Sequence, residues 1–376
     1  MTARPVAAAI YADSQNCADM LYTTGFFAPD PFLWLRLRQD EVIVVSTLEY
    51  GRAVNERHAH VRVLSQEEAK RQCRLRRYNT AAVMAAFLRR AGLKQCRVPA
   101  AFPAGLAHEL RRDHSVRVVP ADDAFCPGRR RKTTAQIEMV KRGVELAEAG
   151  LEAGLALLRQ ADVGRDAKLV LNRQTLTAAR VRGEIEAEIV RRGGVAFRTI
   201  VAPGAHGADP HAIGEGPIAA NTPVIIDIFP RDIDTGYHGD LTRTVVKGRA
   251  PEVVAGAFRA VQKARDRAIA KAKPGVGAAT LHRLAADTLS AAGFETDAAA
   301  ERPCGFFHGL GHGLGLEVHE RPRVNTRGPR LRQGDVVTIE PGLYYPDWGG
   351  VRLEDVIALR PGGCRNLTSA PTQLEL

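Results

Sequence analysis

Residues 224–246 read VIIDIFPRDIDTGYHGDLTRTVV and contain two apolar runs rich in β-branched residues, each of which carries an acid. Asp227 lies inside the first run, and Asp240 opens the second. Gly236 and Gly239 stand between them, and glycines in such a connection are typical of a hairpin. We therefore expect two paired strands that bring Asp240 back beside Asp227.

The two acids of this segment have two interpretations. A single aspartate at such a place is most often a turn or capping residue. Two carboxylates brought together by a hairpin repel each other, which raises the pKa of at least one of them unless a cation is present. The pair indicates a functional site only if further ligands converge on it.

The segments around this hairpin show both helical and strand patterns. A capping box, Thr133 with Gln136, predicts the start of a long amphipathic helix whose apolar residues recur every three or four positions. Further helices are expected over 183–192, 253–272 and 280–292, and strands over 336–339 and 351–357. Helices in blocks, with strands joined by glycine-rich turns, indicate an α+β domain with a mostly antiparallel sheet.

The preceding part of the chain has a different pattern, in which strands alternate with helices. Strands are expected over 6–12, 42–45 and 116–119, with a helix over 81–90. This alternation indicates a smaller α/β domain. The segment 120–132 contains prolines, a glycine and the basic run Arg129–Lys132, and is interpreted as a solvated linker. We place the domains at 1–128 and 129–376.

Length and composition exclude several classes of protein. With 376 residues, 45% of them hydrophobic and 25% charged, the chain is typical of a folded globular protein. No apolar run approaches the roughly 18 residues of a membrane helix, and the apolar stretch 6–12 is interpreted as a strand rather than a signal peptide. We therefore expect a cytoplasmic protein with no membrane partner.

The net charge of +11 is distributed evenly along the chain. Before Gly128 there are 18 basic and 13 acidic residues, a difference of +5, and after it 35 and 29, a difference of +6. A nucleic-acid site would concentrate positive charge in one patch or tail, so no nucleic-acid partner is expected. The six cysteines form no CxxC motif and are expected to be reduced thiols.

A histidine-rich segment lies further along the second domain. Residues 308–319, HGLGHGLGLEVH, hold three histidines and four glycines, without the spacing of a phosphate-binding GxGxxG loop. A lone histidine here would most often be structural. Three of them, His308, His312 and His319, in a chain with nearby acids indicate a site, and the glycines let the backbone approach it closely.

Two more acids stand where strand patterns end or alternate. Glu340 ends an apolar strand pattern and precedes Pro341-Gly342, which is expected to stop the strand. Alternation along 351–357 places Arg352 and Glu354 on one face of a strand. Taken alone, that pair fits a functional site and an ion pair on a solvated edge equally well.

Together these residues form a set of four carboxylates and one imidazole: Asp227, Asp240, His312, Glu340 and Glu354. Oxygen-rich ligands with one nitrogen suit Mn²⁺ or Mg²⁺-like ions, Mn²⁺ first, with Co²⁺, Zn²⁺ or Fe²⁺ as alternatives. The four negative charges would be balanced by two divalent ions. Two such ions can share a bridging water and lower its pKa toward neutrality, which generates a hydroxide for hydrolysis.

These motifs, in this order, resemble the pita-bread metallopeptidase family that includes aminopeptidase P, prolidase and methionine aminopeptidase. The matching segments are 226–228, 236–244, 308–320, 338–342 and 351–355. All five ligand types are present, although the connection between Asp227 and Asp240 is longer than in many members. The resemblance implies a C-terminal pita-bread domain with a curved, mostly antiparallel sheet flanked by helices.

The first domain is similar to the smaller α/β domain of aminopeptidase P, prolidase and creatinase. Simple methionine aminopeptidases lack that domain, and creatinase works without the metal-binding acids that this chain keeps. The resemblance therefore favours the branch of the family that cleaves Xaa-Pro bonds, in small peptides with proline at the second position. It also implies a homodimer.

The resemblance implies how the ligand set would be shared between two ions. Asp227 would bind one ion, and His312 with Glu340 would bind the other. Asp240 and Glu354 would bridge them. A hydroxide between the ions would attack the carbonyl that precedes proline.

The remaining site residues are also implied by the resemblance. His211 would face the substrate, while His308 and His319 would steady the tetrahedral intermediate and move protons. Arg352 would orient the bridging carboxylate or the far end of the substrate. Glu340 would pass the proton of the nucleophile to the leaving nitrogen.

Three alternatives remain open at this stage. The motif residues do not distinguish a dipeptidase from an aminopeptidase, but the length and the compact first domain resemble those of shorter prokaryotic prolidases, which favours a dipeptidase. A pita-bread protein that has lost catalysis and serves as a binding protein would differ in its metal content. A metal-free amidinohydrolase like creatinase would keep its activity in EDTA.

Overall fold

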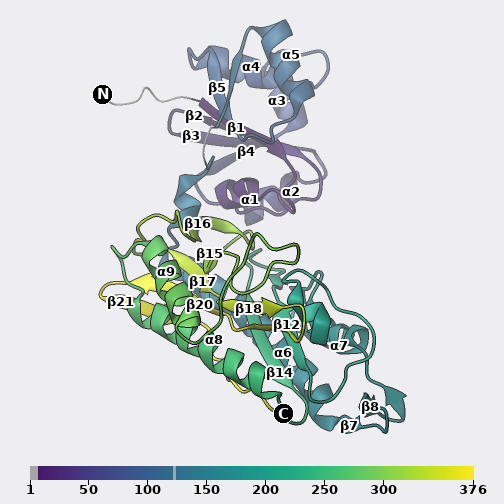
Figure 1. The fold of residues 1–376 in the computed structure, drawn as a ribbon. Coiled ribbons are helices and arrows are strands. Elements are labelled where there is room, and N and C mark those ends of the chain that lie inside the picture. Colours follow the sequence, from purple (N-terminus) through teal and green to yellow (C-terminus); the bar gives the residue numbers. More distant parts are fainter. Residues whose placement is uncertain (1–6, 122–123) are drawn as a thin grey trace. The chain divides into compact units, whose positions relative to one another are not determined.

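The computed structural model describes residues 7–121 and 124–376, and these divide into two compact units, Met1–Arg129 and Arg130–Leu376 (Figure 1). The first expected strand is β1 (Ala7–Ala12), and Val6 lies outside the described residues. Within the described part of the chain, no helix has both the length and the apolar character needed to cross a bilayer.

The first unit is built on a mixed six-stranded sheet with the strand order β4-β3-β2-β1-β5-β6. Its strands pair in parallel at β3/β4, β1/β5 and β5/β6 and antiparallel at β1/β2 and β2/β3. The remaining strands are β2 (Phe32–Leu37), β3 (Asp40–Val45), β4 (Val61–Ser65), β5 (Gln95–Val98) and β6 (Arg117–Pro120).

Alternation along the strands divides the interior of the first unit into two cores. In β1, Ala7 and Ala9 contribute to one core, and Ala8 and Ile10 contribute to the other, because successive side chains point to opposite faces of a sheet. Helices cover both faces (Figure 1), and the predicted α/β pattern is confirmed. One face carries α1 (Ala18–Thr24) and α2 (Tyr50–Glu56), and the other carries α3 (Gln66–Gln72), α4 (Thr80–Arg90) and α5 (Ala104–His114).

The second unit contains two pairs of packed helices, α6 with α7 and α8 with α9. The helix α6 begins at the predicted capping box, in which Thr133 and Gln136 exchange hydrogen bonds. The helix α7 begins five residues before its predicted start, because the side chain of Thr177 caps it. The bounds are α6 (Thr134–Gln160), α7 (Ala178–Arg191), α8 (Glu252–Lys271) and α9 (Ala278–Ser290).

The strands of the second unit pair antiparallel, as predicted, but form several small sheets rather than one. The two larger sheets have the orders β11-β12-β14 and β16-β15-β17-β20-β21. Their strands are β11 (Ile200–Pro203), β12 (Pro223–Ile228), β14 (Leu241–Val246), β15 (Gly311–Gly313), β16 (Glu320–Val324), β17 (Val336–Ile339), β20 (Asp355–Arg360) and β21 (Gly363–Asn366).

Three further sheets are shorter. They are formed by β18 (Gly342–Tyr345) with β19 (Gly349–Arg352), by β10 (Gly194–Val195) with β13 (Arg231–Asp232), and by β7 (Asp162–Val163), β8 (Leu169–Leu171) and β9 (Gln174–Thr175). Short 3₁₀ helices lie at Pro127–Arg130 and Gly204–Ala208.

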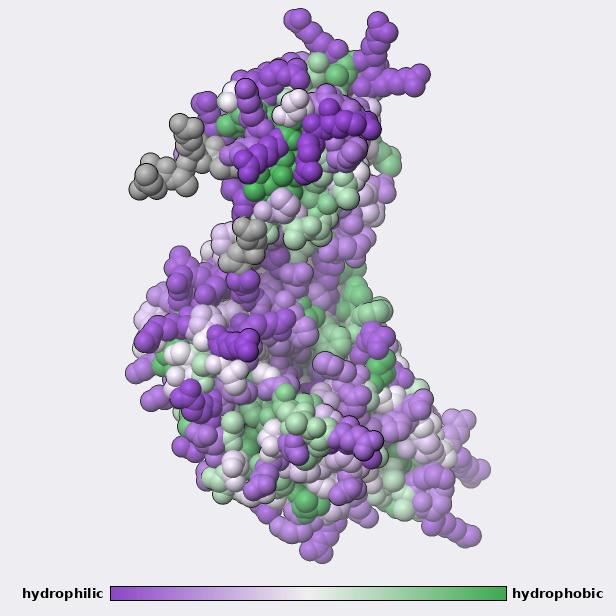
Figure 2. All heavy atoms as spheres, turned by 45° about the horizontal axis from the view of Figure 1, so that its top comes forward, coloured by the Kyte–Doolittle hydropathy of each residue, from purple (hydrophilic) through white to green (hydrophobic). Residues whose placement is uncertain are grey.

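Each helix pair covers one of the two larger sheets. Leu151 of α6 packs in one core with Ile226 of β12, and Val261 of α8 packs in another with Val337 of β17. Figure 2 shows hydrophilic side chains over most of the visible face of this unit, with apolar residues between them. The apolar faces of helices and sheets are therefore turned inward, as burial of apolar surface requires.

The strand predicted over 351–357 is broken in the structure. β19 ends at Arg352 and pairs with β18, whereas β20 begins at Asp355 and pairs with β17. Glu354 lies in the break, and its N–H donates instead to the carbonyl of Thr242 at 3.0 Å. The chain also does not leave the extended conformation for long after Glu340, where a stop was expected. β18 begins at Gly342 and pairs with β19, whereas β17 pairs with β20. Local alternation cannot reveal such a change.

The basic run 129–132 is not a solvated linker, which corrects the sequence interpretation. Arg130 forms an ion pair with Asp335, which is fully buried, at 2.9 Å. Lys132 is itself buried and pairs with Glu320 at 2.9 Å. Charges that looked free in the sequence are thus neutralised by carboxylates about 200 positions away in the chain.

A close backbone contact fixes α6 against the hairpin that carries Asp240. Gly143 of α6 and Gly239 approach so closely that a Cβ on either residue would overlap backbone atoms of the other. Neither glycine is needed here for an unusual backbone angle. Each is needed because only a hydrogen fits at the contact.

We predict that Gly239→Ala will destabilise the protein by about 1–3 kcal/mol, because the added methyl group must displace the backbone of α6. The free energy of unfolding can be measured by urea titration. The matched control is Gly183→Ala in α7, where a Cβ would meet nothing within 4 Å. That change should instead be neutral or stabilise by up to about 1 kcal/mol, and equal effects of the two changes would contradict the argument.

Candidate active site

The predicted hairpin brings the first two acids together. β12 pairs antiparallel with β14, and Asp227 lies opposite Thr242 in this register. Asp240 directly precedes β14 and therefore lies at the same end of the pair. The neighbours of Asp227, Ile226 and Ile228, point into the apolar core, so the carboxylate points to the opposite face.

This face opens into a cavity of about 960 Å³ within the second unit. Every residue that the sequence analysis assigned to the site lines it: Asp227, Asp240, His312, Glu340, Glu354, His211, His308, His319 and Arg352. Part of its wall is apolar and is formed by Phe197, Ile200, Phe229, Phe307, Val318 and Tyr344. The cavity therefore combines a polar floor with apolar surfaces, as small-molecule sites commonly do.

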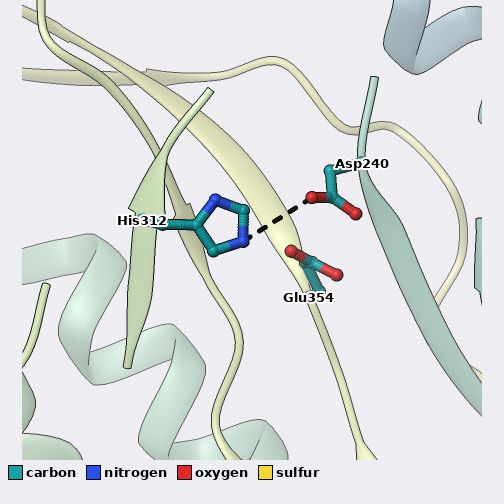
Figure 3. A group of neighbouring side chains, drawn as sticks. All are labelled: Asp240, His312 and Glu354. Atoms are coloured by element: carbon teal, nitrogen blue, oxygen red, sulfur yellow. Dashed lines mark ion pairs between the residues drawn. The ribbon is translucent and has the colours of Figure 1, made fainter. Parts of the chain in front are cut away.

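Three potential ligands lie closest together in the cavity. One ligand atom from each of Asp240, His312 and Glu354 lies within 4.8 Å of the other two, and all three residues are buried. Figure 3 shows a ring nitrogen of His312 directed toward the two carboxylates. The Nε2 atom of His312 lies 3.7 Å from Asp240 Oδ2 and 3.2 Å from Glu340 Oε1.

The remaining acid, Asp227, is held by Arg352. The guanidinium Nη2 donates to Asp227 Oδ2 at 2.6 Å. Arg352 and Glu354 are 4% and 2% exposed, which excludes the alternative of an ion pair on a solvated edge. Arg352 contacts Asp227 rather than the carboxylate of Glu354, to which it is linked only through the hydroxyl of Thr242.

Burial and mutual repulsion disturb the protonation of these acids. Burial raises the pKa of Asp240 well above its usual range, and the Asp227 and Glu340 carboxylates add to this rise against the opposing effect of His312. Burial likewise raises the pKa of Glu354, with a further contribution from Asp240. For Asp227 burial raises the pKa, although Arg352 opposes the shift.

Glu340 behaves differently because it has a cationic partner. Burial by itself would raise its pKa, but the hydrogen bond and the charge of His312 outweigh burial and lower the pKa to about 2. Burial likewise opposes protonation of His312, yet Glu340 raises the pKa of that imidazole. Without an ion, the site therefore contains two ion pairs, Arg352 with Asp227 and His312 with Glu340, beside acids that lack a sufficient counter-charge.

Two oxygen atoms of these acids lack the partner that a metal ion could supply. Oδ1 of Asp227 and Oε1 of Glu354 are buried and have no hydrogen-bond partner in the protein. A buried polar atom without a partner costs about 1–3 kcal/mol. Carboxylate oxygens with one imidazole nitrogen form a suitable set for a divalent cation, which would satisfy both atoms.

Comparison with known proteins identifies the family. Residues 138–361, more than half of the chain, match the sequence model of metallopeptidase family M24. The chain belongs to this family. It is a peptidase that uses divalent metal ions, and the cavity lined by the converging acids is its active-site candidate.

Individual relatives agree with this family membership. An Xaa-Pro dipeptidase of Pyrococcus horikoshii is 30% identical over 286 residues, which cover 75% of each chain. An Xaa-Pro dipeptidase of Pyrococcus furiosus is 32% identical over 255 residues, which cover 67% of each chain.

Solved structures confirm the fold. The crystal structure of the Pyrococcus horikoshii prolidase matches with a TM-score of 0.78 at 27% identity and covers 98% of this chain and 95% of that one. An X-Pro aminopeptidase from Thermotoga maritima matches with a TM-score of 0.81 at 23% identity, covering 99% and 97%. The predicted two-domain pita-bread fold is thereby confirmed.

Several residues that support the ligands were missed in the sequence. The hydroxyl of Thr242 donates to Glu354 at 2.7 Å, and that of Thr338 donates to Glu340 at 3.2 Å. Arg243 donates to the backbone carbonyl of Glu354 at 2.7 Å. The threonines lie two positions from Asp240 and Glu340, so strand alternation would have revealed them.

Tyr344 was also missed, and no sequence signal marks it. It is fully buried, and its hydroxyl lies 3.0 Å from His308 Nε2 and accepts a hydrogen bond from Arg352 at 2.9 Å. It lies in β18, opposite Gly350 of β19. The pKa of Tyr344 is raised to about 12, chiefly by burial, so the phenol stays protonated and can donate to His308.

The three predicted site histidines outside the ligand set, His211, His308 and His319, have different surroundings. Both ring nitrogens of His308 are engaged, Nδ1 with the carbonyl of Gly309 at 2.7 Å and Nε2 with Tyr344. His319 is exposed and packs edge-on against the ring of His312 at 4.3 Å. Burial of part of its ring and the nearby His312 lower the pKa of His319 to about 4. His211 is exposed in a loop that lines the cavity.

We predict that Asp240→Asn will raise the stability of the metal-free protein while abolishing metal binding. The pKa of Asp240 is raised in the folded state, so ionisation destabilises the fold as the pH rises. At pH 7–8 the variant should therefore gain about 1 kcal/mol or more, equivalent to roughly 1–2 °C in Tm for a chain of 376 residues. The gain should vanish near the unfolded pKa of about 4. Calorimetry measures Tm, and titration calorimetry measures binding.

The matched control for this prediction is Asp232→Asn, in the same hairpin. Asp232 is also buried, but its carboxylate accepts hydrogen bonds from the N–H and hydroxyl of Thr235. The amide oxygen of asparagine can still accept these bonds, but the negative charge 3.8 Å from Arg142 Nε is lost, so Tm should stay unchanged or fall and metal binding should remain intact. A stabilised Asp232→Asn protein, or an Asp240→Asn protein that still binds metal, would contradict our account of the site.

Proposed function

We propose that this chain is a metal-dependent Xaa-Pro dipeptidase, an exopeptidase that hydrolyses the bond preceding proline in a dipeptide. The observation that carries the proposal is the convergence of four carboxylates and one imidazole on one cavity with apolar walls. Relatives named as Xaa-Pro dipeptidases support the substrate class. A binding protein that had lost catalysis would not need to keep all five ligands, and a creatinase-like enzyme would not need the acids.

The ligand set accommodates two ions, and we propose Mn²⁺, with Co²⁺, Zn²⁺ or Fe²⁺ as alternatives. Asp227 would hold one ion, His312 and Glu340 the other, and Asp240 with Glu354 would contact both. Four carboxylates balance two divalent cations in charge. When bound, such ions activate a water molecule for attack and polarise the scissile carbonyl.

Proton transfer is the proposed task of Glu340. A carboxylate is ionised at neutral pH, so Glu340 can accept a proton from the nucleophile. Thr338 and His312 hold its Oε1 atom in place. From this position Glu340 would deliver the proton to the imide nitrogen, which leaves as the amine of proline.

The three histidines outside the ligand set have different proposed roles. A neutral His319 is expected at pH 7 because its pKa is about 4, and its N–H can donate to the developing oxyanion. His308 already uses both ring nitrogens, so we assign it to holding Tyr344 and, through Tyr344, Arg352. His211 would contact the substrate at the mouth of the cavity.

The apolar wall accounts for the preference for proline. An Xaa-Pro bond has no N–H, so a site that recognises it relies on the shape and apolar surface of the pyrrolidine ring. Phe197, Phe307 and Val318 offer such a surface. The free amino group of the substrate would meet the buried acids, which restricts cleavage to the first bond.

We further propose that 1–128 form a creatinase/prolidase-type domain and 129–376 the catalytic domain. The two compact units support this division. We also propose that the enzyme works in the cytoplasm as a homodimer, which sedimentation of the purified protein can test. Six free cysteines are in accord with a reducing compartment.

We predict that the Mn²⁺-loaded protein will hydrolyse Ala-Pro faster than Ala-Pro-Ala, with little turnover of Ala-Ala. EDTA should abolish the activity, and added Mn²⁺ should restore it. Released amino acids can be measured by chromatography. Cleavage of Ala-Ala as fast as Ala-Pro would contradict the proline preference, and activity that survives EDTA would favour the creatinase-like alternative.

We predict that Glu340→Gln will lower kcat by about 10²–10⁴-fold, because an amide cannot accept the proton. Steady-state kinetics on Ala-Pro measures the loss. The control is Glu301→Gln, at an exposed position outside the cavity, which should leave kcat unchanged. A Glu340→Gln enzyme with kcat near that of the parent would remove Glu340 from the proposed role.

A further inference from the structure

We propose that Lys132 is a positioning residue for the active site, acting through Glu320 on the turn of residues 314–319. This turn carries Val318 and His319 on the wall of the cavity. The inference rests on the proposed function for its kinetic test, and on the geometry alone for its structural test. Lys132 does not line the cavity, and its ammonium group pairs with Glu320, which is not one of the five ligands.

The ion pair between Lys132 and Glu320 is almost completely withdrawn from water. Nζ of Lys132 lies 2.9 Å from Glu320 Oε2, and the two side chains are 2% and 5% exposed. Burial of two charges is costly, so this pair adds little net stability compared with apolar residues, but loss of one partner deprives the other, still buried, of a counter-charge. A buried ion pair of this kind is expected to fix the relative positions of the two chain segments that carry it.

The lysine end of the pair is anchored in the second unit. The N–H of Lys132 donates to the carbonyl of Gly334 at 2.7 Å, and Arg131 forms a β-bridge with Asp335. Residues 334–335 directly precede β17, the strand that leads to Glu340. Lys132 also directly precedes Thr133, the residue that caps α6. Its ammonium group therefore projects from a fixed backbone.

The glutamate end of the pair organises the turn. Oε1 of Glu320 accepts the N–H of Glu317 at 3.2 Å. Gly315 lies directly against the carboxylate, since a Cβ at this position would be 2.8 Å from Oε2. The carbonyl of Gly315 in turn accepts the N–H of His238 at 2.8 Å. The turn thus folds around the Glu320 carboxylate, whose charge Lys132 neutralises.

The turn determines where His319 stands. His319 is bonded directly to Glu320, which opens β16, and its ring packs edge-on against His312 with the centroids 4.3 Å apart. A displacement of about 1 Å at a catalytic group can lower a rate by about 10²-fold. Loss of the Lys132 charge should therefore reduce catalysis through His319, although Lys132 touches no reacting atom.

The kinetic test is a double-mutant cycle between Lys132→Met and His319→Ala, with the Mn²⁺-loaded protein and Ala-Pro. Lys132→Met should lower kcat by about tenfold or more and change KM by less than about twofold. In the His319→Ala background the same change should lower kcat by less than about twofold, because the group it positions is gone. Equal losses in the two backgrounds would overturn the proposal.

The matched control is Arg130→Met, two positions away. It removes an ion pair to a fully buried acid, Asp335, that belongs to the neighbouring turn before β17 rather than to the turn of residues 314–319. Its effect on kcat should be the same with and without His319. If Arg130→Met couples to His319 as strongly as Lys132→Met does, the effect is general destabilisation and the proposal is wrong.

A second measurement needs neither metal nor substrate. Hydrogen exchange of the metal-free protein, followed by mass spectrometry, should show faster exchange over 314–319 in Lys132→Met than in the parent and in Arg130→Met. Lys132→Arg, which keeps the charge, should restore the protection. Unchanged exchange over 314–319 in Lys132→Met would refute the proposal even if Ala-Pro is not a substrate.

A folding failure does not leave the proposal untested. If Lys132→Met does not fold, Lys132→Met/Glu320→Gln removes both charges and avoids an uncompensated buried acid. This double variant should show the same faster exchange over 314–319, because the Lys132 anchor is absent. Parent-like exchange in the folded double variant would overturn the proposal. Failure of the parent itself to cleave Ala-Pro would instead overturn the proposed function.

Discussion

The structure depends on one electrostatic constraint, which is the burial of four carboxylates in one cavity. Arg352, and His312 when it is protonated, supply at most two positive charges against the four negative charges that full ionisation of the acids would place there. The raised pKa values of Asp240 and Glu354 are the direct consequence. Without a cation to neutralise them, these buried carboxylates would only destabilise the fold. The family of metallopeptidases to which the chain belongs explains the cost, because metal binding reverses it.

The fold delivers three of these acids at interruptions of its sheets and the fourth, Asp227, from within β12. Asp240 precedes β14, Glu340 follows β17, and Glu354 lies in the break between β19 and β20. Within a continuous strand, neighbouring side chains point to opposite faces and cannot all reach one point. At an interruption the backbone changes partner and direction, which allows acids from separate segments to converge. The helix pairs that back the two larger sheets keep these interruptions in place.

The support of the site extends well beyond its ligands. The Thr242 and Thr338 hydroxyls hold two of the acids, while Tyr344 joins His308 to Arg352. Such contacts restrict the positions of the ligands before any ion arrives, and preorganisation of this kind lowers the cost of binding and of reaction. The Lys132–Glu320 pair belongs to this support, because it holds the turn of residues 314–319 in place although its burial has a desolvation cost.

The sequence by itself determined the chemistry of the site and much of the local structure. Acids inside apolar strands, glycines between Asp227 and Asp240, and a capping box at Thr133 are local signals, because they reflect alternation, turn geometry and helix ends. Only the tertiary structure decided that Arg352 holds Asp227 and that Lys132 is buried against Glu320. These pairs join residues 125 and 188 positions apart. Their formation depends on where strands change partners, and no local periodicity encodes that choice.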